Sequence, residues 1–215
     1  MVIETLIYAN GIENHYPEIY KLLVNPAVQG FNMKERTWLL MCLLSLHCRT
    51  PKQFSLFFEF VEQMVNGPEE MEKVKEDYKG AHLIEILPSV IAAHEFKVIQ
   101  IARITDTSEF ITSDNPVLIV DDNGNLQNHQ YREQFNIDNT LLIPLDTKHC
   151  CILKSATDKN GISIYNKGFY NKIERIDVDC SFSQNVNFLM LRSADKSYFG
   201  SEKYLKAFFR LLKFV

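Results

Sequence analysis

The sequence has no long apolar run and no secretion pattern. Its longest apolar run, Trp38 to Leu46, falls far short of the roughly 20 residues that a membrane-spanning helix needs. Residues Met1 to Ile7 do not place a basic region before an apolar stretch, so they are not a signal peptide. No internal repeat or low-complexity segment is visible. We therefore expect a soluble, cytoplasmic protein without a membrane span.

The cysteines form no C-x-x-C pair and have no regularly spaced histidine partners, which excludes a typical structural zinc site. They are Cys42, Cys48, Cys150, Cys151 and Cys180. An odd number of cysteines without a secretion signal favours reduced thiols and no disulfides. The adjacent Cys150 and Cys151 stand in an apolar run, where we expect them to be small buried residues.

Several common functional motifs are also missing. Neither usual kind of glycine-rich phosphate loop is present, and no glycine flanks Ser113 as a nucleophile elbow requires. Residues 121–125, D-D-N-G-N, lack the rest of a calcium loop and are predicted to be a turn. The sequence thus predicts no metal site and leaves the cofactor unknown.

The charge balance gives little information about partners. A net charge of −4 and a pI of about 5.9 provide no general attraction to nucleic acid or anionic membranes. Lysines and an arginine lie along the predicted C-terminal helix from Ser201, so a local contact with nucleic acid is possible without support from the net charge. The partner is unknown at this stage.

The sequence does have the composition of an ordinary globular protein, with 46% apolar and 23% charged residues. Its 215 residues are enough for one domain with a sizeable core. Residues 1–95 have the periodicity of helices. Thr50 as N-cap and Pro51 as first helical residue, with Gln53 completing a capping box, predict that two helices meet at Arg49. A later helix, 81–95, is predicted to be bent or interrupted near Pro88.

The pattern changes to that of strands at Phe96. We expect a mostly antiparallel sheet within 96–165 and a helical end over 166–215, with Ser181 and Gln184 as a second capping box. Residues 125–139 are expected to be a loop. The predicted strands are 98–104, 110–111, 117–120, 141–144, 150–153 and 162–165. The sequence therefore predicts a single domain of the α+β class: N-terminal helices, a central sheet and C-terminal helices.

Four segments in this order resemble the bacterial family called domain of unknown function 4238. They are Leu46-His47-Cys48-Arg49-Thr50-Pro51, Phe110 to Val117, Ile143-Pro144-Leu145-Asp146, and Val186-Asn187-Phe188 followed by Arg192 and Ala194. The resemblance covers most of the chain. It implies an apolar helix ending in an Arg-Thr-Pro turn, a Thr-Ser-Asp-x-Pro segment, an Ile-Pro-Leu strand and an Asn-bearing helix.

The chain departs from the family pattern at two places. Family members usually open with a Lys-His-His-x-Val-Pro-like motif, which has no counterpart here, and Asp146-Thr147-Lys148 replaces a frequent Ser-Pro pair. If the family is enzymatic, those basic residues are candidate site members. Their absence favours an inactive relative.

The candidate site lies at the strand end 112–114. Asp114 is able to bind a metal, act as a base or pair with an arginine, or else to cap the turn before Pro116; the hydroxyls of Thr112 and Ser113 have the same two interpretations. A helix hairpin that packs on a sheet places its turn at the edge of that sheet, and Asp114 is expected at a strand end on the same edge. We therefore expect Arg49 to be the counter-ion of Asp114, because an unpaired carboxylate that is partly buried is costly. The alternative for Arg49 is a helix C-terminus, where the dipole favours a cation.

Two functions follow from these residues. The first is a binding or interaction module, or a truncated inactive relative of an active form. The alternative is a hydrolase or nuclease-like enzyme with a polar site at Arg49, Thr112, Ser113 and Asp114. The sequence identifies neither the ligand nor the substrate.

Overall fold

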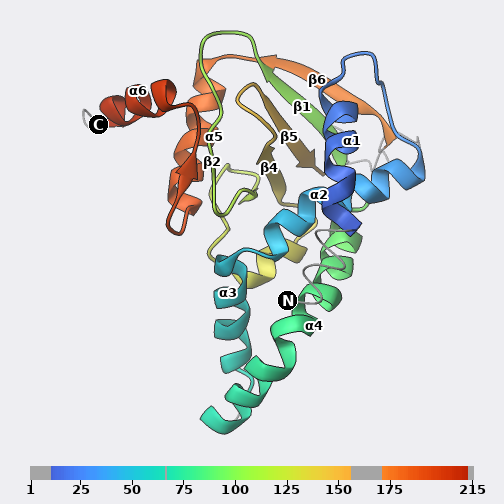
Figure 1. Ribbon diagram of the computed structural model, residues 1–215, viewed down its shortest axis with the longest axis vertical. Coiled ribbons are helices and arrows are strands. Elements are labelled where there is room, and N and C mark those ends of the chain that lie inside the picture. The colour runs from blue at the N-terminus through green and yellow to red at the C-terminus, as the bar shows by residue number, and fades with distance from the viewer. Residues whose placement is uncertain (1–10, 66, 156–170, 213–215) are drawn as a thin grey trace.

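The chain folds as two layers of helices around one sheet, as the sequence predicts for an α+β protein. The structure, a computed structural model, describes residues 11–65, 67–155 and 171–212. Four helices come first: α1 (Glu13–Val24), α2 (Met33–Cys48), α3 (Pro51–Glu62) and α4 (Pro68–His94). The large sheet contains β1 (Val98–Ile104), β3 (Leu118–Val120), β4 (Thr140–Pro144), β5 (His149–Lys154) and β6 (Ile173–Val178). Helices α5 (Cys180–Ser193) and α6 (Glu202–Leu212) close the chain (Figure 1).

The sheet has the order β3-β4-β5-β1-β6. Its pairs are antiparallel except β1 with β6, which is parallel. Strand β6 lies in the segment that was predicted to be helical, because its apolar residues are separated by Glu174, Arg175 and Asp177 and form no strand-like run. The strand predicted at 162–165 lies outside the described residues.

The two faces of the sheet pack against different helices. Alternation along β5 shows this directly: Cys151 and Leu153 join the core formed with α1, α2 and α4, whereas Cys150 and Ile152 join the core formed with α5 and α6. Both cysteines are fully buried, as predicted, and burial raises the pKa of the Cys150 thiol to about 12. All five cysteines are free thiols.

Thr50 and Pro51 open α3 directly after α2, as the sequence predicts, but Gln53 does not complete the predicted capping box, because its buried Oε1 has no hydrogen-bond partner among the described residues. The Thr50 hydroxyl accepts a hydrogen bond from the Gln53 backbone N–H at 3.3 Å, and Pro51 is the first residue of α3. Arg49 is the C-cap of α2. At the other end of α2, Asn32 and Glu35 form a reciprocal capping box that fixes the start of this central helix.

Helix α4 is not interrupted at Pro88, which leaves a bend as the remaining form of that prediction; proline removes only one N–H, and the neighbouring Leu87 and Val90 are buried in the core. Two other local predictions were wrong. The predicted loop 125–139 contains a short 3₁₀ helix, η2 (Tyr131–Phe135), whose Tyr131 packs on α3. The N-cap of α5 is Asp179, not Ser181, since its carboxylate accepts from two N–H groups of the first turn.

Two short strands form a separate ribbon on the α5 side. β2 (Thr112–Ser113) pairs antiparallel with β7 (Tyr198–Phe199), which precedes α6. No helix in the described part of the chain combines the length and the apolar content that crossing a membrane requires.

Candidate functional site

Asp114 holds a turn together. Its carboxylate accepts hydrogen bonds from the backbone N–H groups of Asp195 at 2.9 Å, Lys196 at 2.7 Å and Ser197 at 2.9 Å. Burial raises the pKa of this carboxyl, but the backbone donors outweigh burial, so the net pKa is lowered. These contacts are structural, but they do not cap the turn before Pro116 as the sequence suggested: they tie the end of α5 to the segment that enters β7.

Thr112 and Ser113 lie in the β2–β7 ribbon, opposite Phe199 and Tyr198. The Ser113 hydroxyl is buried and donates to the Asn115 carbonyl at 3.0 Å, so it packs locally. Thr112 contributes to a pocket of about 230 Å³ that Asp146 also lines. Only this threonine of the predicted strand end therefore lies near the polar site described below.

The predicted ion pair between Arg49 and Asp114 is not formed in the described residues. Arg49 pairs with Glu13 at the start of α1 and lines a different pocket, of about 290 Å³, with Tyr16. The prediction failed for two physical reasons. Backbone donors already satisfy Asp114, and helix α1, which begins at Glu13, places the Glu13 carboxylate at Arg49.

Replacing Asp114 with Asn tests its structural role. The amide keeps the shape but loses one acceptor, so backbone N–H groups of residues 195–197 lose a partner. We expect a loss of about 1–3 kcal/mol in the free energy of unfolding, measured by urea denaturation. Asp122→Asn, in an exposed turn, is the matched control and should change stability by less than about 0.5 kcal/mol. A catalytic role instead predicts unchanged stability and lost activity.

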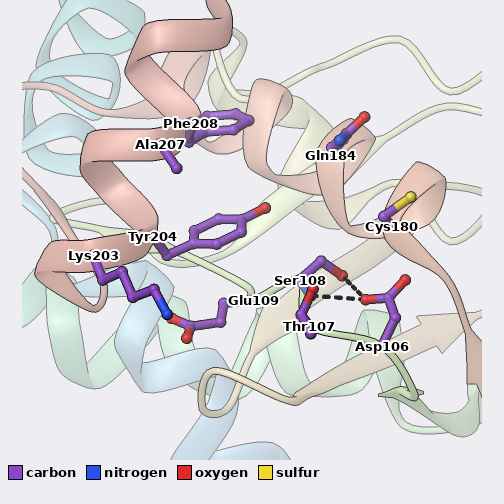
Figure 2. A pocket seen from close by; sticks show the side chains of 10 residues that line it. All are labelled: Asp106, Thr107, Ser108, Glu109, Cys180, Gln184, Lys203, Tyr204, Ala207 and Phe208. Carbon is purple, nitrogen blue, oxygen red and sulfur yellow. Dashed lines mark hydrogen bonds between the residues drawn. The ribbon is translucent and has the colours of Figure 1, made fainter.

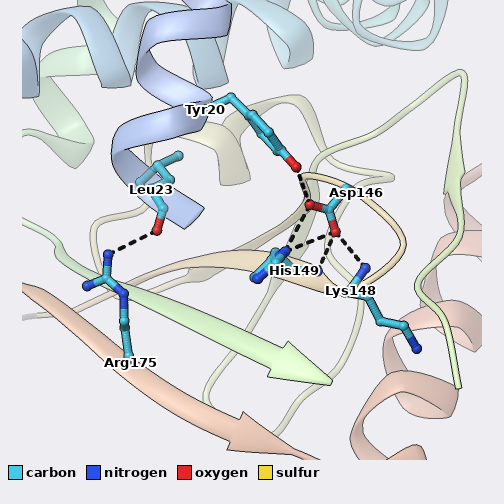
Figure 3. Close-up of polar contacts among 6 residues, drawn as sticks. All are labelled: Tyr20, Leu23, Asp146, Lys148, His149 and Arg175. Atoms are coloured by element: carbon cyan, nitrogen blue, oxygen red, sulfur yellow. Dashed lines mark hydrogen bonds and ion pairs between the residues drawn. The ribbon is translucent and has the colours of Figure 1, made fainter. Parts of the chain in front are cut away.

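The structure reveals a polar cluster at the turn between β4 and β5. The Asp146 carboxylate accepts from the backbone N–H groups of Lys148 at 2.6 Å and His149 at 2.8 Å, which closes the turn. It also accepts from the Tyr20 hydroxyl at 2.5 Å and lies 2.9 Å from the Nδ1 atom of His149 (Figure 3). Two segments far apart in sequence, α1 and the β4–β5 turn, thus meet at one carboxylate.

These contacts determine the charges in the cluster. Burial raises the pKa of the Asp146 carboxyl, but the hydrogen bonds from Tyr20, Lys148 and His149 outweigh it and lower the pKa. The same bond to Asp146 raises the pKa of Tyr20 to about 12. Asp146 is therefore an anion at neutral pH, and Nδ1 of His149 carries the hydrogen that faces it.

The other ring nitrogen of His149, Nε2, points away from Asp146, toward the side on which Arg175 lies (Figure 3). His149 and Arg175 line a pocket of about 300 Å³ together with Arg103 and Asp177. In the strand register His149 is opposite Arg103, and Arg103 is opposite Asp177, so these side chains form one row on the same face of the sheet. Arg103 and Asp177 pair with each other at 3.0 and 3.3 Å.

Arg175 is the cation of this pocket that has no carboxylate partner among the described residues. Its Nη2 donates to the carbonyls of Leu23 at 3.1 Å and Asn25 at 2.6 Å, at the C-terminus of α1. Its Nη1 is buried and has no hydrogen-bond partner within the described ranges. Burial lowers the pKa of the guanidinium, which nevertheless keeps its charge. The pocket therefore combines an uncompensated positive charge with an imidazole.

Sequence reasoning missed most of this site. The one available signal was Asp146-x-x-His149 across a hairpin turn, a spacing that allows the carboxylate to reach the following imidazole. Tyr20 is 126 residues away from Asp146, and no local pattern could have connected them. Among the residues that the structure describes, no three His, Cys, Asp or Glu side chains are grouped so as to hold a metal ion.

Comparison with known proteins agrees with the resemblance derived from the sequence. The family model described as "Protein of unknown function (DUF4238)" matches residues 2–203. No curated protein and no solved structure matches the chain. The proposed activity therefore depends on the site itself.

Proposed function

The chain belongs to the family described as "Protein of unknown function (DUF4238)", and we propose that it is a binding module for a small anionic ligand. The binding group is a phosphate or a carboxylate, held in the pocket between His149 and Arg175. The observation that carries this proposal is the guanidinium of Arg175, which lines the pocket without a carboxylate partner among the described residues. A partly buried cation of this kind is most readily compensated by an anion.

The polar contacts around the pocket support this assignment. Asp146 fixes the ring of His149 so that Nε2 faces the pocket as a donor or acceptor. Arg103 lines the pocket, but its charge is neutralised by the ion pair with Asp177, so it adds no net charge. A volume of about 300 Å³ suits a small ligand, such as a sugar phosphate or an organic acid.

Binding of inorganic phosphate tests the proposal. Titration followed by calorimetry should give saturable binding to the unmodified protein. His149→Gln should weaken it about tenfold, since one hydrogen bond to a charged group is worth about 1.5–3 kcal/mol. His129→Gln, at an exposed position outside the pocket, should bind normally. The proposal fails if His149→Gln binds phosphate as tightly as the unmodified protein does. It also fails if neither phosphate nor acetate shows saturable binding to the unmodified protein.

A second candidate is a hydrolase, conceivably nuclease-like, in which His149 is the general base. The cluster of Tyr20, Asp146 and His149 favours it, because a carboxylate at Nδ1 leaves the lone pair of Nε2 directed to the pocket. Cleavage of a chromogenic phosphodiester, lowered about 100-fold or more in His149→Gln, would support hydrolysis. If the protein binds the phosphodiester but does not cleave it, the function remains that of a binding module for an anion.

We also propose a bacterial, cytoplasmic origin for the protein. The support is the resemblance to a bacterial family and the free state of all five cysteines, four of which are buried.

A further inference from the structure

The charge of the chain is strongly separated between its parts. Residues 180–215 contain six Lys or Arg and two Asp or Glu, a net charge of +4, whereas the other 179 residues carry −8. The described basic residues of this segment are all exposed: Arg192, Lys196, Lys203, Lys206 and Arg210. A protein whose net charge is −4 therefore has one basic end, built from α5, β7 and α6 (Figure 1).

The same end exposes aromatic rings. Phe188 is 49% exposed, Tyr198 42% and Phe199 56%, and among the described residues only one other large aromatic side chain, Phe96, is comparably exposed. One of these rings stands beside a cation, and another packs against the basic helix. The guanidinium of Arg192 lies 5.9 Å from the ring centroid of Phe188. Tyr198 lies 5.0 Å from the ring of Phe209 in α6, which places β7 against the basic helix.

The way α6 packs distinguishes between possible anionic partners. Its apolar side is already used, because Phe208 is buried and Tyr204 and Leu205 pack into the core formed with α5. A helix that binds a bilayer needs a free apolar face, and α6 presents mainly charge outward. Exposed rings interleaved with cations instead match unpaired bases and phosphates, since bases that are not stacked in a duplex stack on aromatic side chains.

The large pocket beneath α6 does not itself provide the phosphate path. It measures about 550 Å³ and is lined by Asp106, by Glu109 beside the start of α6, and by the α6 residues Lys203, Tyr204 and Phe208 (Figure 2). Lys203 is exposed as well, so it also faces the outer side of α6. Two carboxylates repel phosphate. The path for a backbone therefore runs outside this pocket, along the exposed cations of α6 and past β7.

We propose that the α5–β7–α6 end binds single-stranded nucleic acid, with phosphates on Lys203, Lys206 and Arg210 and bases on Tyr198 and Phe199. This inference goes beyond the proposed anion pocket and does not depend on it, because the two sites share no residue. The binding is expected to be tolerant of sequence and sensitive to salt, since neither stacking nor phosphate contact reads base edges.

Fluorescence anisotropy with a labelled oligo(dT) and a labelled oligo(U) tests the surface. The unmodified protein should bind both strands more tightly than a duplex. A triple variant, K203Q/K206Q/R210Q, should bind at least about tenfold more weakly. The slope of the logarithm of the binding constant against the logarithm of the salt concentration should become shallower by about two. The matched control K21Q/K34Q/K73Q removes the same charge from exposed positions elsewhere and should bind normally. Y198A/F199A should weaken binding about tenfold or more.

Three results would overturn the proposal. The first is equal binding by the two triple variants, which would mean that only overall charge matters. The second is binding to vesicles containing phosphatidylserine but not to either oligonucleotide, which would assign this end to a membrane. The third is no loss in Y198A/F199A. Because every substituted side chain is exposed, thermal melts should show that all variants remain folded, and His149→Gln should bind the oligonucleotides normally.

Discussion

Lowering the pH from 7 to about 4.5 is expected to remove about 5 kcal/mol from the free energy of unfolding. The cause is a pair of buried histidines, His47 near the end of α2 and His94 at the end of α4, each only 1% exposed. Burial and then the neighbouring His94 lower the pKa of His47 to about 3. Burial and then Lys97 lower the pKa of His94 to about 4, although its ring bonds the Gln134 carbonyl.

The direction of the effect follows from these lowered values. In the folded protein both rings stay neutral down to about pH 4, whereas in the unfolded chain they take up protons near pH 6.5. Stability is therefore complete above about pH 7 and decreases as the pH falls below about 6.5, because the unfolded state binds more protons. Below about pH 5.5 two protons accompany unfolding, and the slope approaches about 2.7 kcal/mol per pH unit.

Among the described residues, neither ring nitrogen of His47 has a hydrogen-bond partner that would stabilise a charge. His94 repels a positive charge on His47. Lys97, whose Nζ binds the Ile137 carbonyl at 2.7 Å, repels a positive charge on His94. Protonation of either ring is therefore coupled to opening of this part of the core.

Urea denaturation monitored by circular dichroism, repeated from pH 8 to pH 4, measures this slope. The double variant H47L/H94Q lacks both titrating groups, and its glutamine is able to keep the bond to the Gln134 carbonyl. Its stability should change little between about pH 6.5 and pH 5. His129→Gln, at an exposed position, should retain the full slope. An equally steep loss in the double variant would assign the effect to other groups.

The sequence predicted those parts of the fold whose causes are local. Thr50 and Pro51 fix the start of α3 through contacts within one turn. The strands were recognisable because their apolar residues continue over both faces, as at Cys150 and Cys151. Strand β6 escaped recognition since it is an edge strand whose polar residues are partly exposed.

The candidate site was not predictable to the same extent, because its contacts are long-range. Asp114 was singled out as either a functional group or a cap of the turn before Pro116, but the partners that it has, Asp195 to Ser197, lie about 80 residues away. The link between Tyr20 and Asp146 depends on how α1 crosses the sheet. So does the position of the Arg175 guanidinium, which binds the end of α1 and has no carboxylate partner within the described ranges. Only the topology of the whole domain determines that crossing.

Replacing Arg36 with Met is expected to cost about 2–6 kcal/mol in the free energy of unfolding, about 1–3 kcal/mol for each of two carbonyls that lose their donor. Arg36 lies in α2 and is 1% exposed. Its Nε donates to the Glu95 carbonyl at 2.8 Å, and its Nη2 donates to the Lys97 carbonyl at 2.5 Å. Both carbonyls belong to the segment that connects α4 to β1. One side chain therefore fixes the point at which the helical layer turns into the sheet.

Methionine fills part of the space but donates no hydrogen bond, so both carbonyls would remain buried without the partner they have now. Arg36→Lys should recover only part of the loss, since a single ammonium group does not reproduce the two directions of the guanidinium. Lys34→Met, an exposed position in the same helix, is the control and should stay within about 0.5 kcal/mol of the unmodified protein. Urea denaturation at pH 7 distinguishes these cases. Equal stability of Arg36→Met and Lys34→Met would show that the connection is held by its apolar neighbours, with the buried guanidinium contributing nothing.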